Sequence, residues 1–147
     1  MTARRARRAE QGSAVVEFVV LAVVMLIPLI YLVMMLARLQ AGSYAVSTAA
    51  REAGRAYVTT SVGQSAQARA EAAAHIAFLD HSFEDDGRLT IACDGAPCLR
   101  PDGLVETTAT ITVPLPLIPS FARDVIPLSV PVSASHLSTV DRFRGLP

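Results

Sequence analysis

The chain has 147 residues, of which 52% are hydrophobic, and its basic and acidic side chains balance. This length suffices for one modest domain, and a zero net charge does not indicate the strongly basic surface of a nucleic-acid-binding protein. The hydrophobic fraction is slightly high for a soluble domain, and the excess comes from one apolar run near the N-terminus. We therefore expect a small domain attached to an apolar segment.

Residues 1–12 form a basic leader. Its arginines outnumber its one acid, Glu10; they are Arg4, Arg5, Arg7 and Arg8. A basic cluster could bind nucleic acid, but membrane orientation accounts for the same cluster. We therefore expect no nucleic-acid partner.

Residues Phe18–Ala37 form an uncharged, apolar run. Its 20 residues, at about 1.5 Å of helical rise each, span the roughly 30 Å hydrocarbon core of a bilayer. A buried helix of a globular protein would show a polar stripe, and this run shows none. We predict a single-pass transmembrane helix. Because the arginine-rich flank stays in the cytoplasm, the C-terminal part is expected outside the cytoplasmic (inner) membrane.

A secretory signal peptide is the obvious alternative for this run. Such a signal has a shorter apolar core, followed by a cleavage site of small residues. The run here is longer, although Ala41–Ser43 could imitate the cleavage site. A secreted domain with a mature start near Ser43 therefore stays open. Pro28 lies inside the run, where membrane helices tolerate proline and are kinked by it.

The residues before the run carry the most specific pattern. Gly12 ends the leader, and Glu17 follows five residues later, next to Phe18. This pattern resembles the leaders that prepilin peptidase cuts after the glycine. The resemblance implies cleavage between Gly12 and Ser13 with retention of the apolar helix. Gly12 offers a backbone that a protease can approach closely, and the arginines hold the scissile bond at the anionic membrane surface.

Glu17 is the unusual residue at the head of the apolar run. A charged side chain costs up to about 3 kcal/mol at the centre of a bilayer and less near its edge. The resemblance implies that Glu17 pairs with the new α-amino group at Ser13 of a neighbouring subunit. Such a pair would offset the burial cost and fix the axial register between subunits. Alternatively, Glu17 only reaches into the lipid headgroups.

The helical pattern continues beyond the run, so that residues 13–60 are predicted as one helix; a plain alanine-rich connector after the run is the alternative. Its outer part has a face of small residues that permits close helix packing; they are Gly42, Ala45, Ala49, Ala53 and Ala56.

With the leader and the segment 47–55, the chain resembles the TadE/TadG-like minor pseudopilins of tight-adherence (Flp-type) pilus assembly. Pro28 lies later than the proline of many family members. The resemblance covers residues 1 to about 60. It implies a minor subunit of a type IV pilus or a related secretion apparatus, with prepilin peptidase, other pilin and pseudopilin subunits and the assembly platform as partners. The alternative is a signal-anchored extracytoplasmic binding domain that does not polymerise.

Residues 61–147 are predicted as an extracytoplasmic α+β domain, in which a small antiparallel β-sheet packs on the helices. A second helix is expected at 64–83 and an acidic turn at 84–87, where hydrophobic periodicity changes to alternation. Strands are predicted at 89–93, 105–113 and 125–136. Pro114, Pro116 and Pro119 predict an extended link between the last two strands.

Cys93 and Cys98 enclose a turn-forming sequence. Outside the cytoplasm the default is a disulfide; free thiols and a zinc site with His75 or His81 are the alternatives. We expect no metal and no cofactor. The sequence has no phosphate-binding loop, zinc motif or nucleophile elbow, and nothing near His136 indicates a catalytic site, so we do not expect an enzyme.

Overall fold

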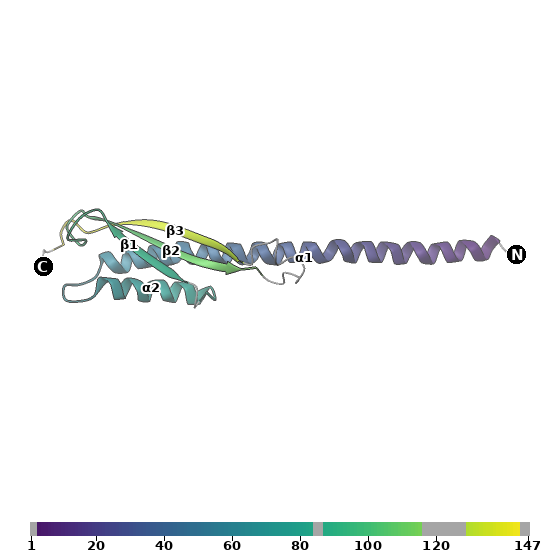
Figure 1. The fold of residues 1–147 in the computed structure, drawn as a ribbon, viewed down its shortest axis with the longest axis horizontal. Coiled ribbons are helices and arrows are strands. Elements are labelled where there is room, and N and C mark those ends of the chain that lie inside the picture. The colour runs from purple at the N-terminus through teal and green to yellow at the C-terminus, as the bar shows by residue number, and fades with distance from the viewer. Residues whose placement is uncertain (1–2, 84–86, 116–128, 145–147) are drawn as a thin grey trace. The chain divides into compact units, whose positions relative to one another are not determined.

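The computed structural model describes residues 3–83, 87–115 and 129–144, with side chains from residue 14 onward. Its elements are α1 (Ala3–Val58), α2 (Ala66–Asp80), β1 (Arg88–Cys93), β2 (Leu104–Pro114) and β3 (Ser129–Thr139) (Figure 1). The predicted α+β fold class is confirmed: a long apolar N-terminal helix and a second helix precede a three-stranded antiparallel sheet.

Helix α1 begins inside the basic leader rather than at Ser13. The leader is rich in Ala, Arg, Gln and Glu, which are strong helix formers. Pro28 lies inside α1 and does not end it. The helix ends where Thr59 and Thr60 turn their hydroxyl groups back to the carbonyl oxygens of Arg55 and Ala56, at 2.8 and 2.7 Å. The carbonyl oxygen of Arg55 also accepts the backbone N–H of Thr59 at 3.1 Å, whereas the backbone N–H of Thr60 goes to Tyr57. The Thr60 hydroxyl therefore supplies Ala56 with the donor that a helix end lacks.

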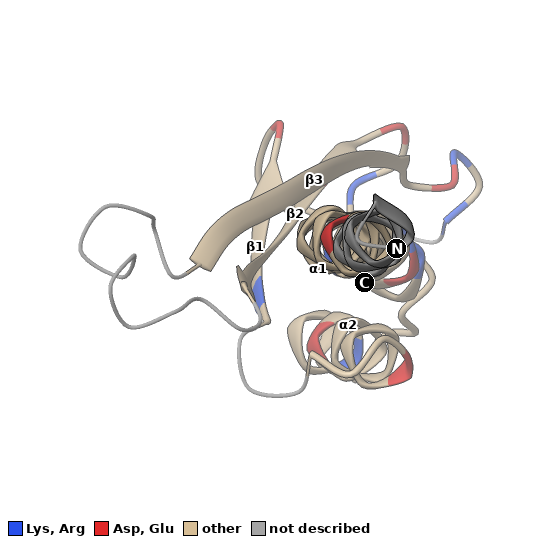
Figure 2. Ribbon diagram, turned by 90° about the vertical axis from the view of Figure 1, so that its right-hand side faces the viewer, with Lys and Arg blue, Asp and Glu red and all other residues tan. Residues whose placement is uncertain are grey.

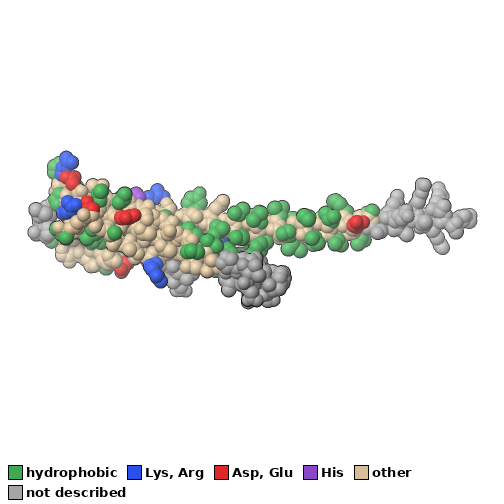
Figure 3. Space-filling view, turned by 45° about the horizontal axis from the view of Figure 1, so that its top comes forward, with side chains coloured by type: hydrophobic (Ala, Val, Ile, Leu, Met, Phe, Trp, Pro, Cys, Tyr) green, Lys and Arg blue, Asp and Glu red, His purple; other side chains and the backbone are tan. Residues whose placement is uncertain are grey.

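The chain forms two compact units, an N-terminal unit of residues 1–37 and a C-terminal unit of residues 38–147. In the N-terminal unit, every side chain from Ala14 to Ile30 is exposed. Hydrophobic side chains line this stretch of α1 in the view of Figure 3. Because this surface is apolar on all sides, it needs an apolar environment to cover it.

The C-terminal unit has its sheet on one side of α1 and α2 on the other (Figure 2). The sheet order is β1-β2-β3, with β2 in the centre. Alternate residues of β2 are buried, as the period-two pattern predicts; they are Val105, Thr107, Ala109, Ile111 and Val113. Strand β2 thus presents one continuous face to the helices.

The third strand extends further than predicted, to Thr139 instead of His136. Its pairing with β2 explains the difference, because Leu104 at the start of β2 pairs with Thr139. Val132 and Ala134, which share one face of this strand, pack against the core. Residues 125–128 of the predicted strand lie outside the described residues.

Helix α2 is shorter than the predicted span of 64–83. Ser65 caps its start by accepting a hydrogen bond from the backbone N–H of Ala68 at 3.2 Å. Beyond its end, Ser82 has a φ of 61°, a left-handed conformation that cannot continue a helix. The predicted acidic turn falls largely on residues 84–86, outside the described residues. Of the predicted proline link, Pro114 is the last residue of β2, and Pro116 and Pro119 lie outside the described part.

Candidate functional site

Gly12 and Ser13 both lie within α1. They are about one helical turn before Glu17, so all three belong to the same end of the apolar run. A protease that needs an extended substrate must unwind this turn. Glycine lowers the cost of unwinding, because it is about 1 kcal/mol less favourable than alanine inside a helix.

Glu17 and Phe18 are exposed side chains at the head of the apolar run. Phe18 is 72% exposed, and its neighbours Val15 and Val16 are exposed as well. Among the described side chains, none forms an ion pair with Glu17. A carboxylate on such an apolar surface would require a cationic or hydrogen-bonding partner on transfer into lipid.

Residues 14–58 contain the one stretch of the described chain that is long and apolar enough to cross a membrane, and none of its most apolar window is buried. A core helix of a soluble protein would be mostly covered by other elements. The helix is therefore compatible with a single-pass membrane anchor.

The small-residue face is not available for packing against another subunit. Ala45, Ala49 and Ala53 are fully buried within the C-terminal unit, in one core cluster with residues of α2 and β2. Gly42 lies so close to the sheet that an added Cβ would come within 2.7 Å of Val113 Cγ2. The small residues do permit close packing, as the sequence predicts, but the packing partners are the chain's own sheet and second helix.

One buried hydrogen bond joins α1 to the sheet. The Thr107 hydroxyl donates to the carbonyl oxygen of Ala50 at 2.7 Å. The sheet can approach the helix this closely because the next turn carries Gly54, whose added Cβ would collide with the hydroxyl groups of Thr107 and Ser138. A buried hydroxyl needs such a partner, so this contact fixes how β2 sits on α1.

The end of α1 is bound by an arginine from the far end of the chain. Arg144, which follows β3, donates to the carbonyl oxygens of Val58, at 2.7 Å, and Thr60. A guanidinium group there satisfies free carbonyl groups and complements the negative end of the helix dipole. Sequence reasoning missed this contact, because nothing local to Arg144 indicates a partner 86 residues away.

The predicted disulfide between Cys93 and Cys98 is present, with a Cα–Cα distance of 5.4 Å. Asp94, inside the loop that it closes, forms an ion pair at 2.8 Å with Arg100, which lies just beyond the loop. The zinc alternative fails because both sulfur atoms are used in the disulfide.

The three histidines do not form a cluster with other metal-binding side chains of the described residues; they are His75, His81 and His136. Within the described ranges, no group of three His, Cys, Asp or Glu residues could hold a metal ion.

Comparison of the chain with protein-family models, with curated proteins and with solved structures finds no match. Residue chemistry and geometry therefore carry the functional proposal. The central features are the exposed apolar helix, Glu17 at its head, and the disulfide-containing unit that follows.

Proposed function

We propose that this protein is a minor pseudopilin-like subunit in the assembly of a tight-adherence (type IV) pilus or a related secretion apparatus. In this proposal a prepilin peptidase cleaves after Gly12, and the apolar helix remains in the membrane. One observation carries it: an apolar helix exposed on all sides has a single acid, Glu17, at its head, five residues after a glycine that ends a basic leader.

The proposed orientation places the leader in the cytoplasm and the C-terminal unit outside the cytoplasmic membrane. The arginine cluster before the apolar run supports it, since positive flanks remain in the cytoplasm. The disulfide between Cys93 and Cys98 also supports it, because disulfides persist in oxidising compartments outside the cytoplasm.

Cleavage after Gly12 would change the electrostatic surroundings of Glu17. It would bring this acid into the first turns of the mature helix, near the positive end of the helix dipole. It would also create an α-amino group at Ser13, about 6 Å along the same helix. Glu17 could pair with its own amine, but a pair with a neighbour's amine also holds two subunits in register. We propose the pair between subunits as the one that drives assembly.

The alternative of a secreted domain has less support. Its cleavage site at Ala41–Ser43 lies inside α1, and Gly42 is buried against the sheet. Cleavage there would separate core residues of the C-terminal unit from the helix that precedes them. The continuity of α1 through this segment supports a retained membrane helix.

The first test is the N-terminal residue of the protein purified from membranes, found by intact mass and terminal sequencing. The proposal expects Ser13. A start at Met1 or Thr2 would instead favour a signal-anchored binding domain, and a start near Ser43 a secreted domain. Gly12→Leu should block processing, whereas the control Gln11→Leu, which retains the glycine, should be processed.

The second test concerns Glu17 after processing. Glu17→Gln should still yield a chain that starts at Ser13, but its incorporation into the assembly should fall sharply, because a neutral amide cannot form an ion pair. Glu52→Gln is the matched control, since Glu52 is an exposed acid on the outer part of α1. Normal assembly of the Glu17 variant would rule out the pairing role.

A further inference from the structure

A phenylalanine projects into solvent from the turn after β3. Phe143 is 89% exposed, more than any other large hydrophobic side chain among the described residues. Single exposed apolar side chains are common on protein surfaces. Phe143 differs from them in how firmly its backbone is held.

Three interactions fix the turn around Phe143. Its backbone N–H donates to Asp141 Oδ1 at 2.9 Å. The preceding residue, Arg142, forms an ion pair with Asp102 at 3.3 Å, and the following residue, Arg144, binds the end of α1. A backbone constrained in this way has little conformational freedom left to lose on binding, so that only the side chain of Phe143 remains to be ordered. Aromatic side chains are typical anchors of protein–protein contacts.

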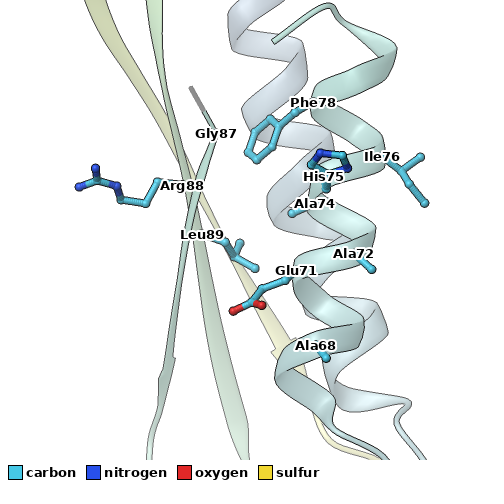
Figure 4. Close-up of a pocket in the computed structure, with 10 residues that line it drawn as sticks. All are labelled: Ala68, Glu71, Ala72, Ala74, His75, Ile76, Phe78, Gly87, Arg88 and Leu89. Carbon is cyan, nitrogen blue, oxygen red and sulfur yellow. The ribbon is translucent and has the colours of Figure 1, made fainter. Parts of the chain in front are cut away.

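The same unit contains a groove with an apolar lining, which is suited to an aromatic side chain. It lies between α2 and β1, with a volume of about 700 Å³. Ala68, Ala72, Phe78 and Leu89 contribute to its apolar lining. Figure 4 shows Glu71 pointing toward β1 across the groove, whereas Arg88 points away from α2. The groove therefore combines an apolar floor with a negative charge.

Glu71 has acceptor capacity for a partner from outside. One of its carboxylate oxygens accepts a hydrogen bond from Gln67 at 2.7 Å, and a carboxylate has about four lone-pair sites. Arg142, next to Phe143, has a side chain that is 71% exposed. The projecting turn thus carries an aromatic ring beside a positive charge, and the groove carries an apolar floor beside a negative one.

We propose that Phe143 of one copy of this chain inserts into the groove between α2 and β1 of a second copy. Arg142 keeps its Nε on Asp102 of its own chain, and its terminal Nη groups face Glu71 of the second copy. The two contact surfaces are different parts of the chain, so the contact is head-to-tail. Such contacts repeat in one direction unless the rotation closes a ring. The contact lies entirely in the C-terminal unit and does not require processing of the leader.

The test is photo-cross-linking of the full-length protein in membranes and in detergent. Phe143→benzoylphenylalanine keeps an aromatic ring at the anchor and reports its neighbour by mass spectrometry. We expect cross-links to residues 68–78 or 87–89 of a second copy. Leu137→benzoylphenylalanine, at another exposed position, is the control and should not label these residues. Cross-links to a different surface or a different protein, or none at all, would overturn the proposal.

Charge exchange gives a second, independent measurement. Arg142→Glu or Glu71→Arg alone should lower the cross-link yield roughly tenfold, since each opposes like charges across the contact, and the double variant should restore it. Equal thermal stability of all three variants shows that the C-terminal unit remains folded. Failure of the double variant to recover would contradict the pairing. The N-terminus of the same samples reports processing after Gly12 separately, so the contact and the proposed function can fail independently.

Discussion

The two halves of α1 have the same secondary structure and opposite surroundings. From Ala14 to Ile30 every side chain is exposed, and most are Val, Leu, Ile or Met. From Gly42 to Gly54 the helix instead buries small side chains against the sheet and α2. A bilayer covers large apolar side chains without specific fit, whereas a protein core requires close complementary packing. The size of the side chains therefore distinguishes the half that is suited to a bilayer from the half that packs on its own chain.

The largest expected effect is a charge placed in the buried half. Val46 is 1% exposed, so Val46→Asp puts an unpaired carboxylate in the core and should destabilise the C-terminal unit by about 4 kcal/mol or more. Thermal unfolding of the protein in detergent measures this. Tyr44→Asp is the control, because Tyr44 is 68% exposed. Similar melting temperatures for both variants would contradict the assignment of the core.

A charge in the exposed half should act on membrane insertion instead. Leu26→Arg places a guanidinium group near the middle of the apolar run, at an expected cost to insertion of about 3 kcal/mol. The carbonate-resistant membrane fraction should decrease, while the melting temperature of the C-terminal unit remains that of the parent. Gln40→Arg, in the exposed part of α1 beyond the run, should change neither quantity. Lower unit stability in the Leu26 variant would show that the two halves are not independent.

A smaller effect is expected where α1 touches the sheet. Gly54→Ala adds a Cβ against the hydroxyl groups of Thr107 and Ser138, and such overpacking costs about 1–3 kcal/mol. The better helix propensity of alanine offsets part of this cost, so we expect a net loss of about 1–2 kcal/mol in denaturant unfolding. Ser43→Ala, on the exposed side of the helix, should be neutral or slightly stabilising. An equally neutral Gly54→Ala would mean that the sheet lies further from α1.

The smallest effect concerns the single buried hydroxyl bond from the sheet. Thr107→Val preserves shape and removes the donor to Ala50, which should destabilise the unit by about 1 kcal/mol. The loss is modest because a helix carbonyl retains its internal partner. Thr112→Val, at an exposed position on the same strand, provides the comparison. No difference between the two variants would show that Thr107 is not anchored to the helix.

Local sequence patterns were enough to predict most of the elements. The apolar run, the alternation of β2 and the close spacing of Cys93 and Cys98 each depend on neighbours within a few residues, so periodicity and spacing reveal them. The ends of elements were less accurate. The leader was assigned outside the helix although its residues favour one, and β3 ends three residues later because β2 supplies partners for it.

The features of the candidate site also fall into those that short-range sequence patterns predict and those that depend on distant contacts. The sequence by itself determined the glycine before the apolar run, the acid at its head and the disulfide loop, because these follow from residue type and short spacing. Only the tertiary structure decided that the small-residue face of α1 is covered by its own chain, that Arg144 binds the end of α1, and that Phe143 is held in solvent. Each of these depends on which distant segments meet in space. Hydrophobic periodicity shows which face of an element is buried, but it does not show which distant segment packs against that face.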